Sequence, residues 1–298
     1  MHLVRLTTLL LILCAPLAAR AVDLQPNDIV APLPNKNYVT VSYFSTENTT
    51  AFTNGSVKST PASYANPIIG TNSLILRGAR TYSLGELPAV TYIQLPYGTV
   101  SPAGSLSNAP SDTGIGDLTI ATAVWPYHNR VSRTYFGIAG YLISPTGSYS
   151  SQRAFNVSEN RFRTDLQLGF QTPITDSIDG MIAVDTMWFG GNSQCASACG
   201  LSTNGSLTQK PLTTTQLGPI YRINPIFTVG ASYLYVAGGA TTINNTYMNN
   251  VSNTQRFLLS GQAHTAIGRI SLQYGRDMEI KNGFMQTRVL ALRLMKEF

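Results

Sequence analysis

The stretch RFRTDLQLGFQ, residues 161–171, alternates between two kinds of side chain at every step. One set is Phe162, Thr164, Leu166, Leu168 and Phe170, and the other is Arg163, Asp165, Gln167, Gly169 and Gln171. Successive side chains of a β-strand point to opposite sides, so a period of two predicts a strand with one apolar and one polar face. Soluble β-sandwiches contain such strands too, so the number and spacing of the strands must decide the fold class.

Eleven further segments of the chain show the same alternation. With residues 160–172, the twelve segments are 37–46, 71–82, 88–96, 115–126, 132–144, 160–172, 178–190, 207–223, 225–237, 254–267, 268–278 and 284–298. Most are longer than the globular mean of about 5 to 6 residues. They match the roughly 9 to 11 residues that a tilted strand needs to cross a bilayer.

The connections between these segments alternate in length. Long polar connections follow the odd-numbered segments, at 47–70, 97–114, 145–159, 191–206 and 238–253, and short ones follow the even-numbered segments. An even number of strands joined in this way is typical of an outer-membrane barrel with short periplasmic turns and long extracellular loops. Only 279–283 breaks the alternation. Residues 37–298 are therefore predicted to be an all-β, membrane-spanning, antiparallel up-and-down β-barrel of about twelve strands.

Composition excludes several other classes. The 298 residues are 43% hydrophobic and only 11% charged, against about 25% charged residues in ordinary soluble domains. Disordered chains combine low hydrophobicity with high net charge, which this chain lacks. No run of about 18 apolar residues predicts a transmembrane helix. Stretches with a helical period are also missing, which argues against a soluble α/β enzyme.

The N-terminus indicates export. Residues 1–21 have a basic start, an apolar stretch and an Ala19-Arg20-Ala21 cleavage site, which predicts a secretory signal peptide and a Gram-negative outer-membrane destination. Its removal would lower the net charge from +6 to +4, too little to indicate a nucleic-acid partner. Residues 22–36 carry three prolines and no strand pattern. They are either a periplasmic tail or a short plug in the lumen, and their shortness favours the tail.

The C-terminus carries a second indication of a barrel. Leu290, Leu292, Leu294 and the terminal Phe298 share one face. An aromatic last residue on an alternating strand resembles the signal that the outer-membrane assembly machinery reads. Lys296 interrupts this face, but near the interface a cation costs only about 0 to 1 kcal/mol.

Aromatic residues are expected to form two girdles at the membrane interfaces. The periplasmic girdle would contain Trp125, Tyr127, Phe170, Tyr221, Phe227 and Phe298, and the outer one Trp188, Phe189, Tyr233 and Tyr235. Cys195 and Cys199 lie four residues apart in a long, polar connection without neighbouring metal ligands. In an exported chain this spacing predicts a small disulfide, with two free thiols as the alternative.

Several short motifs resemble one family. They are residues 23–37 (DLQPNDIVAPLPNKN), 95–98 (LPYG), 114–118 (GIGDL), 144–149 (SPTGSY) and 160–161 (NR). Together they resemble the outer-membrane transporter family named for the phenol meta-cleavage pathway, whose members are β-barrels distantly similar to channels for hydrophobic compounds. Asn35 stands where the family pattern leads us to expect glycine. The resemblance implies uptake of small, often aromatic or apolar molecules, and it implies no catalytic residues.

The polar faces of the strands supply the candidate site residues. The lumen and selectivity candidates are Arg77, Asp117, Arg163, Asp165, Asp185, Arg256, His264 and Arg293. These charges either satisfy one another inside the barrel or line a constriction that sets selectivity by charge and size. In the second case, neutralising Arg163 or Arg256 should shift ion selectivity toward cations.

An outer-membrane lipid hydrolase is the enzymatic alternative. Such enzymes resemble small barrels with a His-x-Ser pair on one strand, the Ser as nucleophile and the His as its base. His128 and His264 are followed two residues later by Arg130 and Ala266, so neither supplies the pair. The sequence thus predicts a non-enzymatic channel for passive uptake of small molecules, embedded in outer-membrane lipid, without cofactor or metal. The alternative is a structural or adhesive barrel that acts through its extracellular loops.

Overall fold

The computed structural model describes residues 23–298. The expected signal peptide, residues 1–21, lies outside the described residues. Within the described part of the chain, no helix is both long and apolar enough to cross a membrane.

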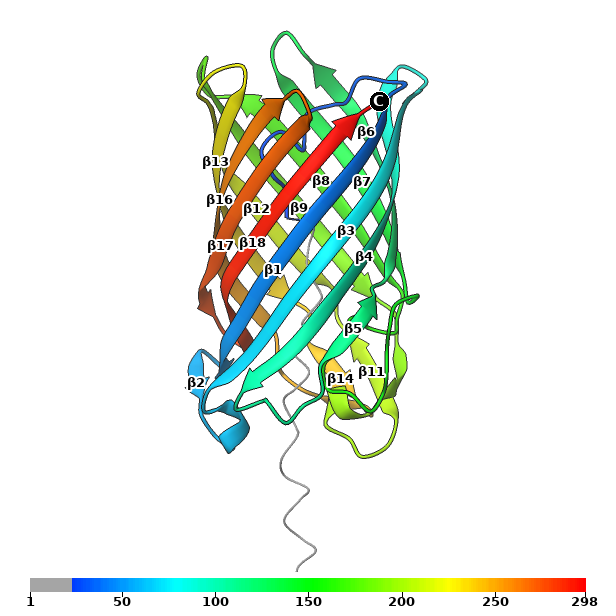
Figure 1. Ribbon diagram of the computed structural model, residues 1–298, viewed down its shortest axis with the longest axis vertical. Helices are drawn as coiled ribbons and strands as arrows, with labels where there is room; N and C mark the ends of the chain where they lie inside the picture. Colours follow the sequence, from blue (N-terminus) through cyan, green and yellow to red (C-terminus); the bar gives the residue numbers. More distant parts are fainter. Residues whose placement is uncertain (1–22) are drawn as a thin grey trace, which may run out of the picture.

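Twelve long strands form one closed, antiparallel barrel (Figure 1). They are β1 Asn37–Thr53, β3 Pro67–Leu84, β4 Leu87–Gly104, β6 Leu118–Asn129, β7 Thr134–Ser144, β8 Arg163–Pro173, β9 Ile178–Phe189, β12 Leu212–Arg222, β13 Phe227–Gly238, β16 Ser252–Thr265, β17 Gly268–Ile280 and β18 Gly283–Glu297. β18 pairs with β1, for example Leu294 with Val41, which closes the sheet. A closed sheet leaves no unpaired edge in the lipid. The predicted twelve-stranded barrel is confirmed.

The two ends of the barrel differ (Figure 1). The C-terminus, the start of β1 and the short turns lie at one end, which we assign to the periplasm. The other end carries the long connections and most of the small elements: β2 Ser56–Lys58, η1 Ala62–Tyr64, β5 Asp112–Ile115, β10 Asn192–Cys195, η2 Ser197–Cys199, β11 Gly205–Gln209, β14 Thr241–Ile243 and β15 Thr246–Tyr247. β10, β11, β14 and β15 form a second sheet of four strands. Only residues 281–282 separate β17 from β18, so the break in the loop alternation is real.

The first three barrel strands extend further than their side-chain pattern indicates. β1, β3 and β4 contain 17, 18 and 18 residues. The β1–β3 register continues without interruption from Asn37↔Arg80 to Thr49↔Ile68. Backbone hydrogen bonds hold such a ladder together, so pairing continues after the apolar alternation has ended.

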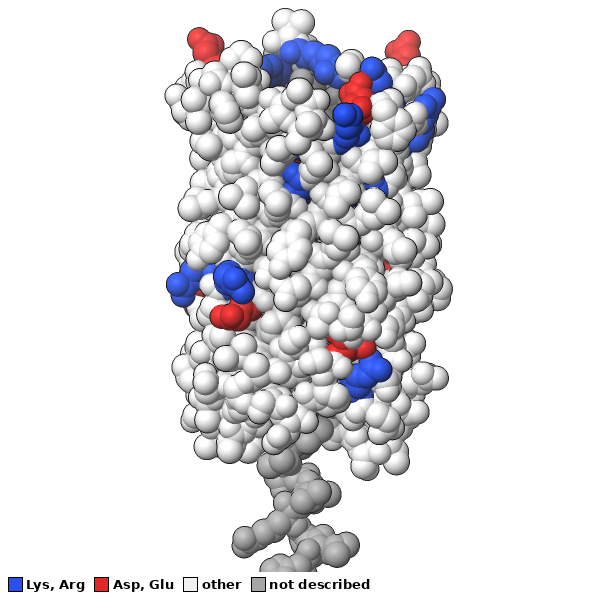
Figure 2. Space-filling model, viewed as in Figure 1, with Lys and Arg blue, Asp and Glu red and all other residues white. Residues whose placement is uncertain are grey.

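The barrel wall is apolar outside and polar inside. In β8, Leu166 and Leu168 are exposed, whereas Asp165 and Gln167 are buried. Figure 2 shows an outer wall on which most of the visible surface carries neither acidic nor basic side chains. Water-soluble proteins bury apolar residues and expose polar ones. An apolar outer face and a polar inner face suit a barrel that is surrounded by lipid.

One residue of the expected periplasmic girdle faces the lumen instead. Trp125 is only 6% exposed and its indole N–H donates to the carbonyl oxygen of Ile29, whereas Tyr127 is 49% exposed. The register between β6 and β7 shifts between Val124 and Tyr127. Pro126 cannot donate a backbone hydrogen bond, and a bulge at this point changes which face a side chain occupies. The girdle assignment of Trp125 was therefore wrong.

Residues 23–32 lie inside the barrel, and residues 33–36 lead along its periplasmic rim to β1, so the segment does not hang from the barrel as a periplasmic tail (Figure 1). The backbone of Leu24 exchanges hydrogen bonds with Gln216 of β12, and the carbonyl oxygen of Leu33 accepts from Thr81 of β3. Leu24 and Ile29 are buried. The proline-rich segment cannot pair as a strand, so polar side chains of the inner wall satisfy its backbone groups.

Candidate functional site

A cavity of about 480 Å³ lies in the lumen, between residues 24–32 and the inner wall. Its wall comes from nine strands, from β1 and β3 around to β17 and β18. Tyr92, Trp125 and Tyr141 give it an aromatic side, together with the apolar Ile29 and Val90. Small-molecule sites typically have volumes of about 300 to 1,000 Å³. This cavity is therefore the candidate functional site.

Two arginines of the cavity are paired with the N-terminal segment. The guanidinium of Arg293 in β18 donates to both carboxylate oxygens of Asp28, at 3.0 and 2.9 Å. Arg269 in β17 approaches the same carboxylate at 3.4 Å. Asp28 was not among the residues expected from the sequence, and no strand pattern could have placed it beside Arg293. These contacts fix residues 23–36 to the basic side of the lumen.

Arg77 of β3 has a different environment. Its Nε and Nη2 atoms donate to Oε1 of Gln94 at 3.0 and 2.6 Å, and its guanidinium carbon lies 4.2 Å from the centre of the Tyr92 ring. Among residues 23–298, no carboxylate lies within 4 Å of the Arg77 guanidinium nitrogens. A neutral amide and an aromatic face hold this cation in place without neutralising it.

An acidic wall lies half-way round the barrel from Arg293. Asp165 of β8 and Asp185 of β9 are buried, and Gln167 pairs directly with Asp185 across these strands. Neither carboxylate oxygen of Asp165 has a hydrogen-bond partner within the described residues. These acidic residues thus lie on the part of the barrel wall opposite β18, which carries Arg293.

Two further candidates lie inside the barrel with other neighbours. Arg256 of β16 donates to Asp277 at 2.7 Å and reaches Asp23 at 4.0 Å. His264, near the periplasmic end of β16, lines the cavity and lies 3.5 Å from the amide of Gln262.

Asp117 and Arg163 lie at the extracellular rim, outside the cavity. We expected Asp117 to lie in a strand from 115 to 126, but β6 begins only at Leu118, so Asp117 lies just before the strand. Its carboxylate accepts from the side chain of Ser158, from the backbone N–H of Gly147 at 3.2 Å and from Arg163 at 3.1 Å. Arg163 also donates to Glu159 at 2.7 Å. Of the eight candidates, the structure places only Arg77, His264 and Arg293 on the wall of the cavity.

The rim contains more charged residues than the sequence pattern revealed. Arg161 contacts Glu159, and Arg153 contacts Asp112. Burial raises the pKa of Glu159, but the neighbouring Arg163 and Arg161 outweigh burial and hold that pKa below its ordinary value. Asp112, Arg153 and Glu159 lie in or beside loops, where no alternation exists to mark them, whereas Arg161 lies at the start of the alternating stretch.

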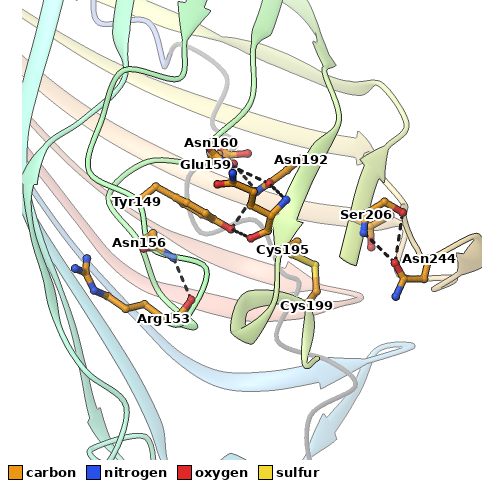
Figure 3. Close-up of a disulfide and its surroundings, with 12 residues drawn as sticks. Tyr149, Arg153, Asn156, Glu159, Asn160, Asn192, Cys195, Cys199, Ser206 and Asn244 are labelled. Carbon is orange, nitrogen blue, oxygen red and sulfur yellow. Dashed lines mark hydrogen bonds between the residues drawn. A yellow bond between two sulfur atoms is a disulfide. The ribbon is translucent and has the colours of Figure 1, made fainter. Parts of the chain in front are cut away.

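The disulfide between Cys195 and Cys199 belongs to the same rim (Figure 3). Both cysteines are buried and cluster with Ile243 of β14. Beside them, Tyr149 donates to the carbonyl oxygen of Gln194 at 2.9 Å and accepts from Asn192 at 3.1 Å. These contacts join the connection after β7 to the one after β9.

Within residues 23–298, no group of three His, Cys, Asp or Glu residues is placed to hold a metal ion. Of the aromatic residues that line the cavity, Tyr92 and Tyr141 were not expected as site residues. Both side chains point into the lumen. Tyr92 of β4 and Tyr141 of β7 each pair with Ala121 of β6, which lies between them. The sequence could have indicated them, because an aromatic side chain on the polar face of an alternating strand is expected to point into the lumen.

Residues 51–294 match the family model described as "Putative MetA-pathway of phenol degradation". The chain belongs to this family. A comparison with curated proteins gives no match.

This member of the phenol-degradation family is similar to several solved structures. An outer membrane channel from Pseudomonas putida F1 has a TM-score of 0.85 and 25% identity, over 93% of this chain and 100% of that one. The β domain of the Bordetella autotransporter BrkA has a TM-score of 0.49 and 11% identity, over 87% and 98% of the two chains. A Pseudomonas aeruginosa FadL homologue has a TM-score of 0.42 and 9% identity, over 88% of this chain and 89% of that one. The channel from Pseudomonas putida supports a bacterial outer-membrane location and a channel-like barrel for this chain.

Three of the motifs that resemble the phenol-degradation family meet at one corner of the rim. The N–H of Gly116 donates to the carbonyl oxygen of Pro96 at 2.8 Å, and that of Ser148 to Ile115 at 2.7 Å. A Cβ atom at Gly116 would lie 2.6 Å from the Pro96 ring, and one at Gly147 would lie 2.7 Å from the Gly116 backbone. Both glycines are therefore required by close approach, and the motifs build structure and not a catalytic site.

Asn35 stands where the family pattern leads us to expect glycine. Its φ of 60° lies in the left-handed region, where glycine is the usual residue. Asparagine tolerates this region better than most side chains, so it fits this backbone conformation.

Proposed function

We propose that the barrel is a channel for passive uptake of small molecules across the outer membrane. The observation that carries this proposal is the cavity of about 480 Å³ inside a closed barrel, with the uncompensated cation of Arg77 on its wall. A barrel that only displayed loops would have no use for a cation without a carboxylate partner on the wall of an internal cavity. The match to a channel from Pseudomonas putida over 93% of the chain supports the same function.

Residues 23–36 act in this proposal as a plug that restricts the lumen. The segment bonds to strands on several sides, including β12 through Gln216, β16 through Gln262 and β18 through Arg293. Water can replace these polar contacts, whereas Leu24, Ile29 and Ala31 also pack against apolar residues of the inner wall. Movement of the segment would expose that apolar surface but would not unpair the strands of the barrel. Solutes larger than the remaining space would pass only after such a movement.

The proposed channel has no catalytic step. His128 contacts the backbone of Trp125, and His264 lies beside Gln262 and Arg269 in the charged part of the cavity. No serine–histidine hydrogen bond is found among residues 23–298. A nucleophile needs a base within hydrogen-bond reach to be activated.

Phe298 is proposed as the contact for the assembly machinery. Its backbone exchanges hydrogen bonds with Asn37, the first residue of β1, at 3.0 and 3.2 Å. Its side chain is 69% exposed. The last residue thus completes the seam of the barrel and remains accessible to a binding partner.

Transport by the purified, folded mature chain tests the proposal. In planar bilayers we expect discrete conductance steps smaller than those of porins with 16 to 18 strands, since twelve strands enclose a narrower lumen. In liposomes we expect uptake of small neutral or aromatic solutes. A folded protein that passes neither ions nor small solutes, even without residues 23–33, would contradict the channel and favour the structural or adhesive barrel.

A further inference from the structure

The cavity carries more positive than negative groups. Its lining contains Arg77, Arg269 and Arg293 but only one carboxylate, that of Asp28. Asp28 is already shared by Arg269 and Arg293. Guanidinium groups stay protonated at any pH at which the protein is folded. The wall of the cavity therefore has an excess positive charge that an anion could balance.

Arg77 is the group best placed to receive this anion. Two of its nitrogens are occupied by Gln94, and Nη1 has no partner within 3.5 Å in the described chain. Stacking on Tyr92 holds the guanidinium at a fixed angle to the cavity. A planar, pre-oriented guanidinium loses little side-chain entropy when it binds a carboxylate.

The acidic wall of the lumen lies beyond the aromatic residues, as seen from Arg77. Asp165 and Asp185 lie on β8 and β9, half-way round the barrel from β18. Gln167, two residues after Asp165 on the same face, lines the cavity between these acids and the basic side. An anion bound at Arg77 is thus separated from these acids by the rings of Tyr92 and Tyr141.

Tyr141 and Trp125 offer their rings to a ligand in the cavity, because their polar atoms already form hydrogen bonds within the protein. The hydroxyl of Tyr141 donates to Gln167 at 2.9 Å, and the indole N–H of Trp125 donates to the carbonyl oxygen of Ile29 at 2.7 Å. The rings of Tyr92 and Tyr141 meet edge to face, with centroids 6.3 Å apart. Rings whose polar atoms are already bonded offer apolar and π-stacking contacts.

We propose that this cavity binds small monoanions with a flat, apolar body, and specifically aromatic carboxylates. The carboxylate contacts Nη1 of Arg77, and the ring lies against Trp125 and Tyr141. This inference rests on the proposed channel function and names the class of solute that the channel selects. A site that pairs one charge with one apolar surface requires both parts of the ligand.

Binding of three probes to the folded mature chain in detergent tests this assignment. Benzoate has the ring and the charge, benzamide has the ring alone, and acetate has the charge alone. Calorimetric titration gives the affinities. The chain has two tryptophans, and Trp188 is exposed on the outer wall. In a Trp188→Phe background, fluorescence therefore reports on Trp125 alone.

Two variants on the same strand provide the matched comparison. Arg77→Gln removes the proposed anion contact, and Arg80→Gln removes an exposed arginine of β3 that donates to Asn37. We expect benzoate to bind at least tenfold more tightly than benzamide or acetate and to perturb Trp125. We expect Arg77→Gln to reduce benzoate affinity to that of benzamide and Arg80→Gln to leave it unchanged.

The results separate this inference from the channel function. Equal affinities for benzoate and benzamide in the unaltered protein would overturn the aromatic-carboxylate site, even if Arg77→Gln did not fold. Conductance without a benzoate preference would leave the channel standing and remove the site. Benzoate binding that depends on Arg77 in a protein that passes no solute would leave the site and remove the channel.

Discussion

The extracellular rim and the lumen cavity are built from the same residue types, but they differ in how the charges are balanced. At the rim, Arg153, Arg161 and Arg163 each contact a carboxylate from Asp112, Asp117 or Glu159. In the cavity three arginines face the single carboxylate of Asp28.

The difference indicates two roles. Buried charges are tolerated when partners and hydrogen bonds satisfy them, and such networks fix the arrangement of loops. The rim joins the connections after β5, β7 and β9 in this way. In the cavity, Arg77 has an amide and an aromatic ring as partners but no carboxylate, and an anionic ligand can supply one. The rim is therefore the structural network, and the cavity is the part that can respond to a solute.

Deletion of residues 23–33 should have the largest effect, and it acts on the cavity alone. We expect a several-fold increase in single-channel conductance, since the segment occupies space through which ions would pass. The deletion leaves the pairing of β1 with β18 intact, so the variant should fold. Folding is checked by gel electrophoresis, in which a folded barrel migrates differently before and after heating. Unchanged conductance in a folded deletion variant would mean that the segment does not limit the lumen.

Removal of Arg163 tests the rim. Arg163→Gln leaves the buried carboxylates of Asp117 and Glu159 without this partner, and breaking a buried pair costs about 3 to 5 kcal/mol. We expect faster proteolysis of residues 145–162 and a small change in ion selectivity. This prediction replaces the sequence-based expectation for Arg163, because the residue lies at the rim and outside the cavity.

Arg288 provides the control for Arg163. Its guanidinium lies 3.8 Å from Glu47, and both side chains are largely exposed. Exposed ion pairs contribute about 0 to 1 kcal/mol, so Arg288→Gln should leave proteolysis unchanged. If the two variants behave alike, the rim network does not hold the loops.

Acid should loosen the rim in a defined pH range. The pKa of Glu159 in the folded protein lies below its ordinary value of 4.5, because Arg163 and Arg161 outweigh the effect of burial. Its contribution is therefore present above pH 4.5 and is lost as the pH falls through the lowered pKa. Pepsin, which is active in acid, should distinguish the unaltered protein from Glu159→Gln at the upper end of its range. This difference should vanish at the lower end, and a constant difference would contradict the role of Glu159.

The smallest effect is expected from the disulfide. Cys195 and Cys199 close a loop of only a few residues, for which chain entropy predicts about 2 kcal/mol of stabilisation. Replacing both with serine should loosen the rim sheet and leave the barrel folded, as shown by gel mobility. Mass analysis under non-reducing conditions should recover the linked peptide from the unaltered protein. Loss of the barrel in the double variant would show that the rim supports more than its own loops.

The strands could be predicted from the sequence, whereas the neighbours of each charge could not. All twelve segments were found from alternation, because the direction of a side chain along a strand depends only on the local backbone. The same rule failed at Trp125, where a bulge before Tyr127 reverses the faces. It also missed the extracellular ends of β1, β3 and β4, whose pairing continues through residues that do not alternate regularly between apolar and polar.

The sequence by itself determined a barrel with an apolar outside, a polar inside and a set of inward-facing charges such as Arg77, Asp165 and Arg293. Only the tertiary structure decided which of these charges are compensated. Asp28 meets Arg293 across 265 positions of the chain, because a segment without strand pattern enters the closed barrel. Cross-strand register and the path of that segment are set by packing, and neither leaves a periodic trace in the sequence. For this reason Arg163 was found paired at the rim, while Arg77 was left in the cavity without a carboxylate partner.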